Sequence, residues 1–315
     1  MCIRDRLLIN LVAAIYWGIR RRFWIIIPLI AIAANWQYLG RIFQLPFTVG
    51  GKEANTLKIA TYNVDSFGNE QSGYSCKEIA AYMKEHRVDI ICFQEFVGNR
   101  YFTSDSIRNA FADWQYAVIP QAPDSTPILQ VALFSKYPVK DSRLITYPNS
   151  RNCSMWCDLD VNGQTVRVFN NHLQTTEVSQ NKRRLERELA KNELTGREEA
   201  VARQLLEGLN ENFRKRAAQA KTLEQLIRTT PYPILVCGDF NSLPSSYTYS
   251  TVKGDNLQDG FQTCGHGYMY TFRYFKRLLR IDYIFHSKEF KGVDYYSPDL
   301  DLCSDHNPVV MEVKM

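Results

Sequence analysis

Six short motifs in this sequence carry carboxylates, histidines and asparagines at or near the ends of predicted strands. They are Thr61-Tyr62-Asn63-Val64-Asp65, Gln94-Glu95, Asn171-His172-Leu173, Gly238-Asp239-Phe240-Asn241, Arg280-Ile281-Asp282-Tyr283-Ile284 and Ser304-Asp305-His306-Asn307-Pro308. Polar groups at strand ends can project from a rigid sheet into a shared cleft. Taken singly, each motif has an ordinary explanation, such as a turn or a hydrogen-bonded structural histidine. As a set in this order, they are far more specific than any one of them alone.

The order of these motifs resembles the endonuclease/exonuclease/phosphatase superfamily, which includes deoxyribonuclease I, the abasic-site endonucleases, sphingomyelinases and inositol-phosphate phosphatases. The resemblance spans Leu57 to Lys314 and rests on QE, GDFN, IDYI and SDHNPV in that order. It implies an α/β fold, a two-sheet α/β sandwich like that of deoxyribonuclease I. It also implies a hydrolase (nuclease, phosphodiesterase or phosphatase) that cleaves phosphoester bonds with Mg²⁺ or Mn²⁺. The apolar N-terminus further resembles a membrane-bound bacterial subgroup.

The metal ligands follow from the resemblance. A phosphoester is anionic and stable, so catalysis must neutralise charge and place a water in line with the scissile bond. Mg²⁺ prefers oxygen ligands. The resemblance assigns it to the carboxylate of Glu95, with Asp305 and Asp65 as further metal ligands, directly or through water.

The resemblance also implies roles for the catalytic residues. His306 would be the general base that draws a proton from the attacking water, and Asp282 would hold its tautomer. Asp239 would orient or help to activate the same water. His172, if protonated, would stabilise developing negative charge or protonate the leaving oxygen. The segment Asn171-His172-Leu173-Gln174 is more similar to deoxyribonuclease I, sphingomyelinases and inositol phosphatases than to abasic-site endonucleases, so a role in abasic-site repair is disfavoured.

Further residues are candidates for substrate binding. Asn63 and Asn241 are neutral donors suited to phosphate oxygens, and Asn241 is also counted as catalytic. Arg216 and Gln219 are three residues apart on one predicted helix face and could reach the cleft. A structural ion pair explains Arg216 equally well. His266, in a glycine-rich loop, is a weaker candidate, and an ordinary loop residue is the simpler interpretation.

Alternating strand and helix patterns predict the elements that hold these residues, in a catalytic domain over residues 57–315. Strands are expected over the ranges Leu57–Val64, Asp89–Phe96, Gln130–Phe134, Cys153–Val161, Thr165–Asn170, Ile234–Cys237, Ile281–His286 and Val309–Val313. A helix is expected at Lys77–His86, and Asn162-Gly163 is typical of a hairpin turn. Many short strands without a strict βαβ repeat favour two packed sheets.

A long charged segment, Thr176–Thr229, interrupts this pattern as a predicted helical insertion. Gly196 is expected to divide it into two helices. Apolar residues recur at every fourth position in one stripe, formed by Val201, Leu205, Leu209, Phe213 and Ala217. The basic residues of the segment are expected to lie on a solvated face.

The first 45 residues predict a transmembrane helical hairpin, joined to the domain by a linker at 46–56. Two apolar runs, Leu7–Ile19 and Phe23–Leu39, flank Arg20–Arg22, which should face the cytoplasm. The catalytic domain is then extracytoplasmic, on the periplasmic side of a bacterial inner membrane. A signal peptide that ends near Ala31-Ile32-Ala33 is the competing interpretation. Met1–Arg6, MCIRDR, matches a translated transposon adapter, and we expect it to be a sequencing artefact.

Composition leaves the substrate open. The formal net charge of +5 does not indicate nucleic acid by itself, and the eight cysteines form no CxxC pair. Nucleic acid, a lipid headgroup and a small phosphoester all remain candidate substrates, and no obligate protein partner is evident. The alternative functions are an exported, non-catalytic binding module on the same fold and a membrane scaffold that acts through Thr176–Thr229.

Overall fold

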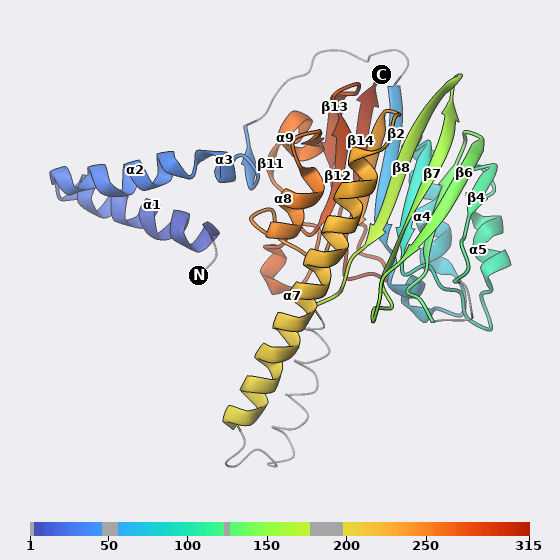
Figure 1. Ribbon diagram of the computed structural model, residues 1–315, viewed down its shortest axis with the longest axis horizontal. Helices are drawn as coiled ribbons and strands as arrows, with labels where there is room; N and C mark the ends of the chain where they lie inside the picture. Colours follow the sequence, from blue (N-terminus) through green and yellow to red (C-terminus); the bar gives the residue numbers. More distant parts are fainter. Residues whose placement is uncertain (1–2, 46–55, 123–126, 177–197) are drawn as a thin grey trace.

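Two mixed β-sheets pack face to face and carry helices on their outer faces (Figure 1). The computed structural model describes residues 3–45, 56–122, 127–176 and 198–315. The first sheet has the strand order β13 (Lys291–Tyr296), β14 (Val309–Lys314), β2 (Thr56–Asn63), β3 (Ile90–Gln94), β5 (Val131–Ser135), β4 (Tyr116–Val118). The second has the order β10 (Leu257–Asp259), β12 (Asp282–Ser287), β9 (Ile234–Asp239), β8 (Gln164–His172), β7 (Cys153–Val161), β6 (Val139–Thr146). The predicted two-sheet α/β sandwich is therefore confirmed.

Three layers of apolar side chains hold the sandwich together. The central layer lies between the sheets and includes Ile59, Cys92 and Cys237, all without exposed surface. A second layer lies between the first sheet and α4 (Tyr74–Glu85) with α5 (Ser104–Ala110). A third joins the second sheet to α7 (Glu198–Arg228) and α8 (Tyr247–Lys253). A further short helix is α9 (Gly260–Cys264).

The predicted strands are observed within two residues of their expected ends. The predicted hairpin is also confirmed, because Val161 pairs with Gln164 and both intervening residues have positive φ, 54° at Asn162 and 90° at Gly163. These angles suit a two-residue turn whose twist matches that of the flanking strands. Continuous apolar runs thus located the strands, because most of these strands are buried on both faces.

The structure does not show the predicted transmembrane hairpin. The helices α1 (Ile3–Ile19) and α2 (Ile26–Ala34) lie side by side, but they have only 17 and 9 residues. At about 1.5 Å per residue, both fall short of the ~30 Å of a hydrocarbon core. The second apolar run is interrupted at Asn35, which has left the helical conformation and binds the Ala31 carbonyl through its side chain. Within the described ranges, no helix has the length and apolar composition needed to cross a membrane.

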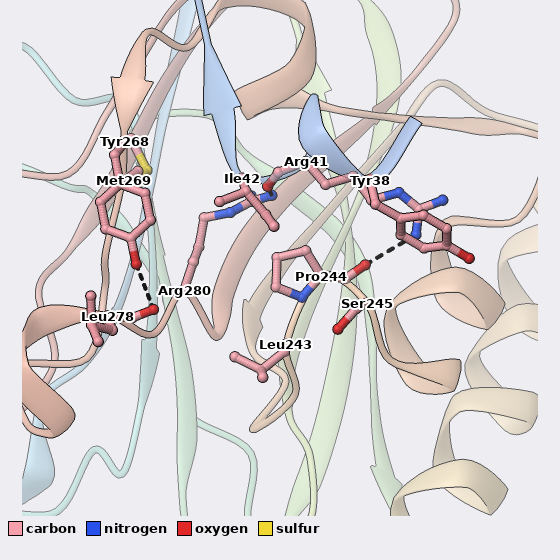
Figure 2. Close-up of a pocket in the computed structure, with 10 residues that line it drawn as sticks. All are labelled: Tyr38, Arg41, Ile42, Leu243, Pro244, Ser245, Tyr268, Met269, Leu278 and Arg280. Atoms are coloured by element: carbon pink, nitrogen blue, oxygen red, sulfur yellow. Dashed lines mark hydrogen bonds between the residues drawn. The ribbon is translucent and has the colours of Figure 1, made fainter. Parts of the chain in front are cut away.

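The segment after α2 docks onto the catalytic domain. Here α3 (Trp36–Leu39) leads into β1 (Phe43–Gln44), which pairs with β11 (Gly267–Tyr268). Arg41 donates to the Pro244 carbonyl at 3.0 Å, and Figure 2 marks this hydrogen bond. The Arg41 carbonyl in turn accepts from the guanidinium of Arg280, which also forms a buried ion pair with Asp259 at 2.8 Å. The predicted linker at 46–56 lies outside the described residues except for Thr56.

The described part of the charged insertion is one long helix, α7, and Gly196 lies outside the described residues. Its buried face is partly polar and consists of Asn212, Arg216, Gln219, Ala220, Leu223 and Ile227. Of the predicted apolar stripe, Leu209 and Ala217 are half-buried, and the side chains of Val201 and Leu205 lie outside the described part of the chain. Phe213, a member of that stripe, is 54% exposed, because α7 contacts the sheet through a different side of the helix.

Candidate active site

The predicted site residues converge because the strands that carry them are neighbours. Asn63 at the end of β2 pairs with Gln94 at the end of the parallel strand β3. In the other sheet, His172 at the end of β8 pairs with Asp239 at the end of β9, and Asp239 pairs with Asp282 at the start of β12. Strands from both sheets thus end at one edge of the sandwich, and their last side chains meet there.

Asp239 lies at the centre of this group. Its carboxylate accepts the backbone N–H of Asn241 at 2.8 Å and side-chain amide protons from Asn241 at 3.0 Å and Asn63 at 3.1 Å. Its Oδ2 lies 3.7 Å from Nε2 of His306 and 3.7 Å from Nε2 of His172. Burial raises the pKa of Asp239, and the nearby Asp282 carboxylate adds to this effect, whereas both histidines oppose it.

His306 is held by Asp282. Its Nδ1 lies 2.9 Å and 3.1 Å from the two carboxylate oxygens of Asp282, and this contact orients the ring with Nε2 toward Asp239. Burial alone would lower the pKa of His306. The carboxylates of Asp282 and Asp239 outweigh burial and raise it to about 10.

Two hydroxyls, those of Thr271 and Ser304, hold the backbone around this pair. Thr271 Oγ1 accepts the backbone N–H groups of Ile281 and Asp282, at 3.0 Å and 3.1 Å. Ser304 Oγ accepts the N–H of His306 and donates to the Asn63 carbonyl. Ser304 lies within a recognised motif, but nothing in the sequence marks Thr271, because its partners are ten and eleven residues away.

Glu95 and Asn63 form the part of the site nearest the first sheet. Asn63 Nδ2 donates to Glu95 Oε1 at 3.2 Å as well as to Asp239, so one amide links the two carboxylates. Glu95 has φ of 51°, a left-handed conformation that is uncommon for a residue with a side chain. Its side chain keeps 27% exposure, so it faces the opening of the site while Asp239 lies at the bottom.

His172 is buried in the site without a hydrogen bond. Neither of its ring nitrogens has a partner among the described residues. Nε2 lies 3.6 Å from Glu95 Oε1 and 3.7 Å from Asp239 Oδ2, which is too long for a direct hydrogen bond. A buried polar group without a partner is costly, and here it lies between two carboxylates.

Arg216 and Gln219 reach the backbone that follows His172. Gln219 Oε1 accepts the Gln174 N–H at 2.8 Å, and Arg216 Nη1 donates to the Gln174 carbonyl at 2.5 Å. Arg216 is 1% exposed, and its Nη2 has no partner within the described part of the chain. Burial lowers the pKa of Arg216 to about 10, while the Asp239 carboxylate opposes this effect.

Three predicted residues lie at the margin of this arrangement. Asp305 is partly exposed, with Oδ1 3.8 Å from Nε2 of His306. Asp65 is exposed, and its N–H donates to the side chain of Asn63. His266 is exposed between α9 and β11, and none of the site contacts above involves it. The structure thus brings the core of the predicted site together, and Asp65 is joined to its margin through Asn63.

The acidic residues fit a divalent cation. Asp239, Asp282 and His306 offer ligand atoms within 4.8 Å of one another, and Glu95 shares the Asn63 amide with Asp239. Buried carboxylates carry negative charge that a cation would offset. Both oxygens of Asp282 already contact His306, so Asp239 and the more exposed Glu95 are better placed to provide metal ligands. The identity of the ion rests on the resemblance.

Comparisons with known proteins agree with this geometry. The model of the endonuclease/exonuclease/phosphatase family matches residues 60–306, more than half of the chain. No curated protein matches the chain in sequence.

Solved structures share the fold. An endonuclease/exonuclease/phosphatase from Bacteroides vulgatus has 18% identity and a TM-score of 0.59, over 83% of this chain and 99% of that one. A humanized D. rerio TDP2 has 16% identity and a TM-score of 0.57, over 82% and 99%. A mannosyl-6-phosphatase from Bacteroides thetaiotaomicron has 16% identity and a TM-score of 0.56, over 82% and 100%. The family match and the assembled motif residues together establish that this chain belongs to the endonuclease/exonuclease/phosphatase family.

Proposed function

We propose that this chain is a metal-dependent hydrolase that cleaves a phosphoester bond by in-line attack of an activated water. The observation that carries the proposal is the Asp282–His306 pair, which faces the buried carboxylate of Asp239. A protein that had kept only a binding role would not need this arrangement. The non-catalytic binding module is therefore not favoured.

The attacking water is proposed to lie between His306 and Asp239. Their nearest atoms are 3.7 Å apart, longer than a direct hydrogen bond but within reach of a bridging water. His306 would take the proton at Nε2 while Asp282 holds Nδ1, and Asp239 would orient the water. A bound divalent cation, held by Glu95 and Asp239, would neutralise the phosphate and lower the pKa of His306 toward that of a base.

The phosphate is proposed to bind where buried nitrogen atoms lack hydrogen-bond partners. Arg216 Nη2 and the ring nitrogens of His172 are buried without partners in the described ranges. Phosphate oxygens are acceptors that would pair with them. Asn63 and Asn241 would add neutral amide donors. In this arrangement, His172 would stabilise the charge that develops on the ester during cleavage.

Both phosphodiesters and phosphomonoesters should be tested as substrates. One D. rerio TDP2 structure contains a single-strand DNA product, and another neighbour is named a mannosyl-6-phosphatase. Proteins of this fold therefore include one bound to nucleic acid and one named as a phosphatase of a sugar phosphate. The direct experiment follows hydrolysis of bis-(p-nitrophenyl) phosphate and p-nitrophenyl phosphate by the full chain with Mg²⁺, Mn²⁺ or a chelator. We expect metal-dependent turnover that disappears in His306→Ala. Turnover that survives both the chelator and this substitution would contradict the proposal.

A further inference from the structure

An apolar pocket of about 450 Å³ opens beside the proposed catalytic residues. Its walls come from α7, the loop after β9, the start of α8 and the segment before β12. The lining residues used in the argument are Phe213, Asn241, Tyr247, Phe272, Phe275 and Leu279. These residues are far apart in the sequence, so the pocket exists only in the folded chain.

The pocket is continuous with the catalytic site at two points. The amide of Asn241 lines the pocket and also donates to the Asp239 carboxylate. The ring of Phe272 lines the pocket and packs edge-on against His306, with ring centroids 5.0 Å apart. A group attached to a phosphate between His306 and Asn241 would therefore enter this pocket.

The walls select an uncharged group. No charged side chain is found among the described residues that line the pocket, whose polar members are hydroxyls and one amide. Three of its rings remain unusually open to solvent, with exposures of 54% for Phe213, 55% for Tyr247 and 51% for Phe275. Exposed apolar rings that gather around a cavity are typical of a ligand site. Aromatic side chains also favour flat partners, because stacking adds to the burial of area.

We propose that this pocket binds an uncharged aromatic substituent of the phosphoester substrate, and that Phe213 and Phe275 determine this specificity. The inference rests on the proposed function for the position of the phosphate. It narrows the substrate to phosphoesters that carry an aryl or heterocyclic group next to the phosphate. The aromatic substituent would replace water against these rings and supply binding energy remote from the reacting bond.

Binding of phosphonates to the full chain tests the proposal without requiring turnover. Calorimetry with Mg²⁺ present would compare methylphosphonate, phenylphosphonate and octylphosphonate, which share one charged group. We expect phenylphosphonate to bind roughly tenfold or more tightly than methylphosphonate, from the burial of one ring. This preference should fall to about threefold or less in Phe213→Ala and Phe275→Ala if each ring supplies about half of the contact. Tyr74→Ala removes an equally exposed ring on α4 and should leave the preference unchanged.

The outcomes separate this inference from the proposed function. Equal affinity for the methyl and phenyl compounds, or a phenyl preference that persists in both variants, would overturn the aromatic pocket. Tighter binding of octylphosphonate than of phenylphosphonate would replace it with an aliphatic pocket and also overturn it. Failure of the chain to hydrolyse any ester, with the phenyl preference intact, would instead remove the proposed function.

Discussion

The site contains two buried histidines that differ in how they are held. His306 and His172 each place Nε2 at 3.7 Å from the same oxygen of Asp239. His306 has Asp282 on its other nitrogen, whereas neither nitrogen of His172 has a hydrogen-bond partner among the described residues. Both residues are therefore buried beside the same carboxylate oxygen, but only His306 has its ring orientation fixed by a hydrogen bond.

This difference indicates which of the two histidines has a fixed orientation before the substrate binds. The Asp282 contact fixes both the ring and the tautomer of His306, as a proton-transfer group requires. In the proposed function, His172 would gain a hydrogen-bond partner when the phosphate binds. We therefore expect substitutions of His306 and Asp282 to have the larger effects on catalysis. Substitution of His172 should act mainly by removing its contact with the bound ester.

The largest effect is expected from His306→Ala. Loss of a positioned proton-transfer group should lower kcat/KM by about 10²–10⁴-fold. Steady-state hydrolysis of the preferred ester would measure this loss, with circular dichroism to confirm folding. His266→Ala is the matched control, because it removes an exposed histidine and should retain activity. Similar activity losses in the two variants would contradict the assignment.

Asp282→Asn should have the next largest effect. The amide cannot accept the Nδ1–H of His306 with both of its terminal atoms, so the ring loses its orientation, and kcat should fall by about 10²-fold or more. Asp160→Asn, at an exposed ion pair with Lys140, is the control and should keep full activity. An unchanged kcat in Asp282→Asn would mean that His306 does not depend on this partner.

A smaller effect is expected from His172→Leu. Removal of a donor to the developing charge should lower kcat by about 10–10²-fold. Folding should not suffer, because the substitution removes a buried ring that lacks partners. Thermal unfolding should therefore give a Tm equal to or above that of the wild type. A clear fall in Tm would show that His172 is structural.

The smallest expected effect on activity comes from Thr271→Val. The change leaves two backbone N–H groups near Asp282 without their acceptor and should lower the free energy of unfolding by about 1–3 kcal/mol. Denaturant titration would measure this loss. Activity should fall less than in Asp282→Asn, because the carboxylate itself remains. Wild-type stability would show that Thr271 does not support the pair.

The sequence predicted the fold and the central site well because both signals are local. Buried strands appear as continuous apolar runs, and Asp239 and His306 lie in compact motifs at the ends or starts of such runs. The register of neighbouring strands then brings the motifs together without further information. The predicted extracytoplasmic location of the domain stays a prediction.

Features that depend on tertiary packing were missed or misread. The stripe through Phe213 has helical periodicity, but periodicity does not distinguish a core from a pocket wall. Arg216 and Gln219 also bind the backbone of Gln174, a contact that their spacing on the helix did not reveal. The aromatic pocket was not visible because Phe213, Tyr247 and Phe275 lie in separate segments.

The most direct test of this account is a double-mutant cycle on the Asp282–His306 pair. The claim under test is that Asp282 acts by orienting His306 and does not bind the metal independently. The values of kcat/KM for Asp282→Asn, His306→Ala and the double variant would be compared at saturating Mg²⁺. The account predicts that the double variant loses no more activity than His306→Ala alone, because residues that act as a unit are not additive. Multiplicative losses would contradict it and give Asp282 a separate role in the site.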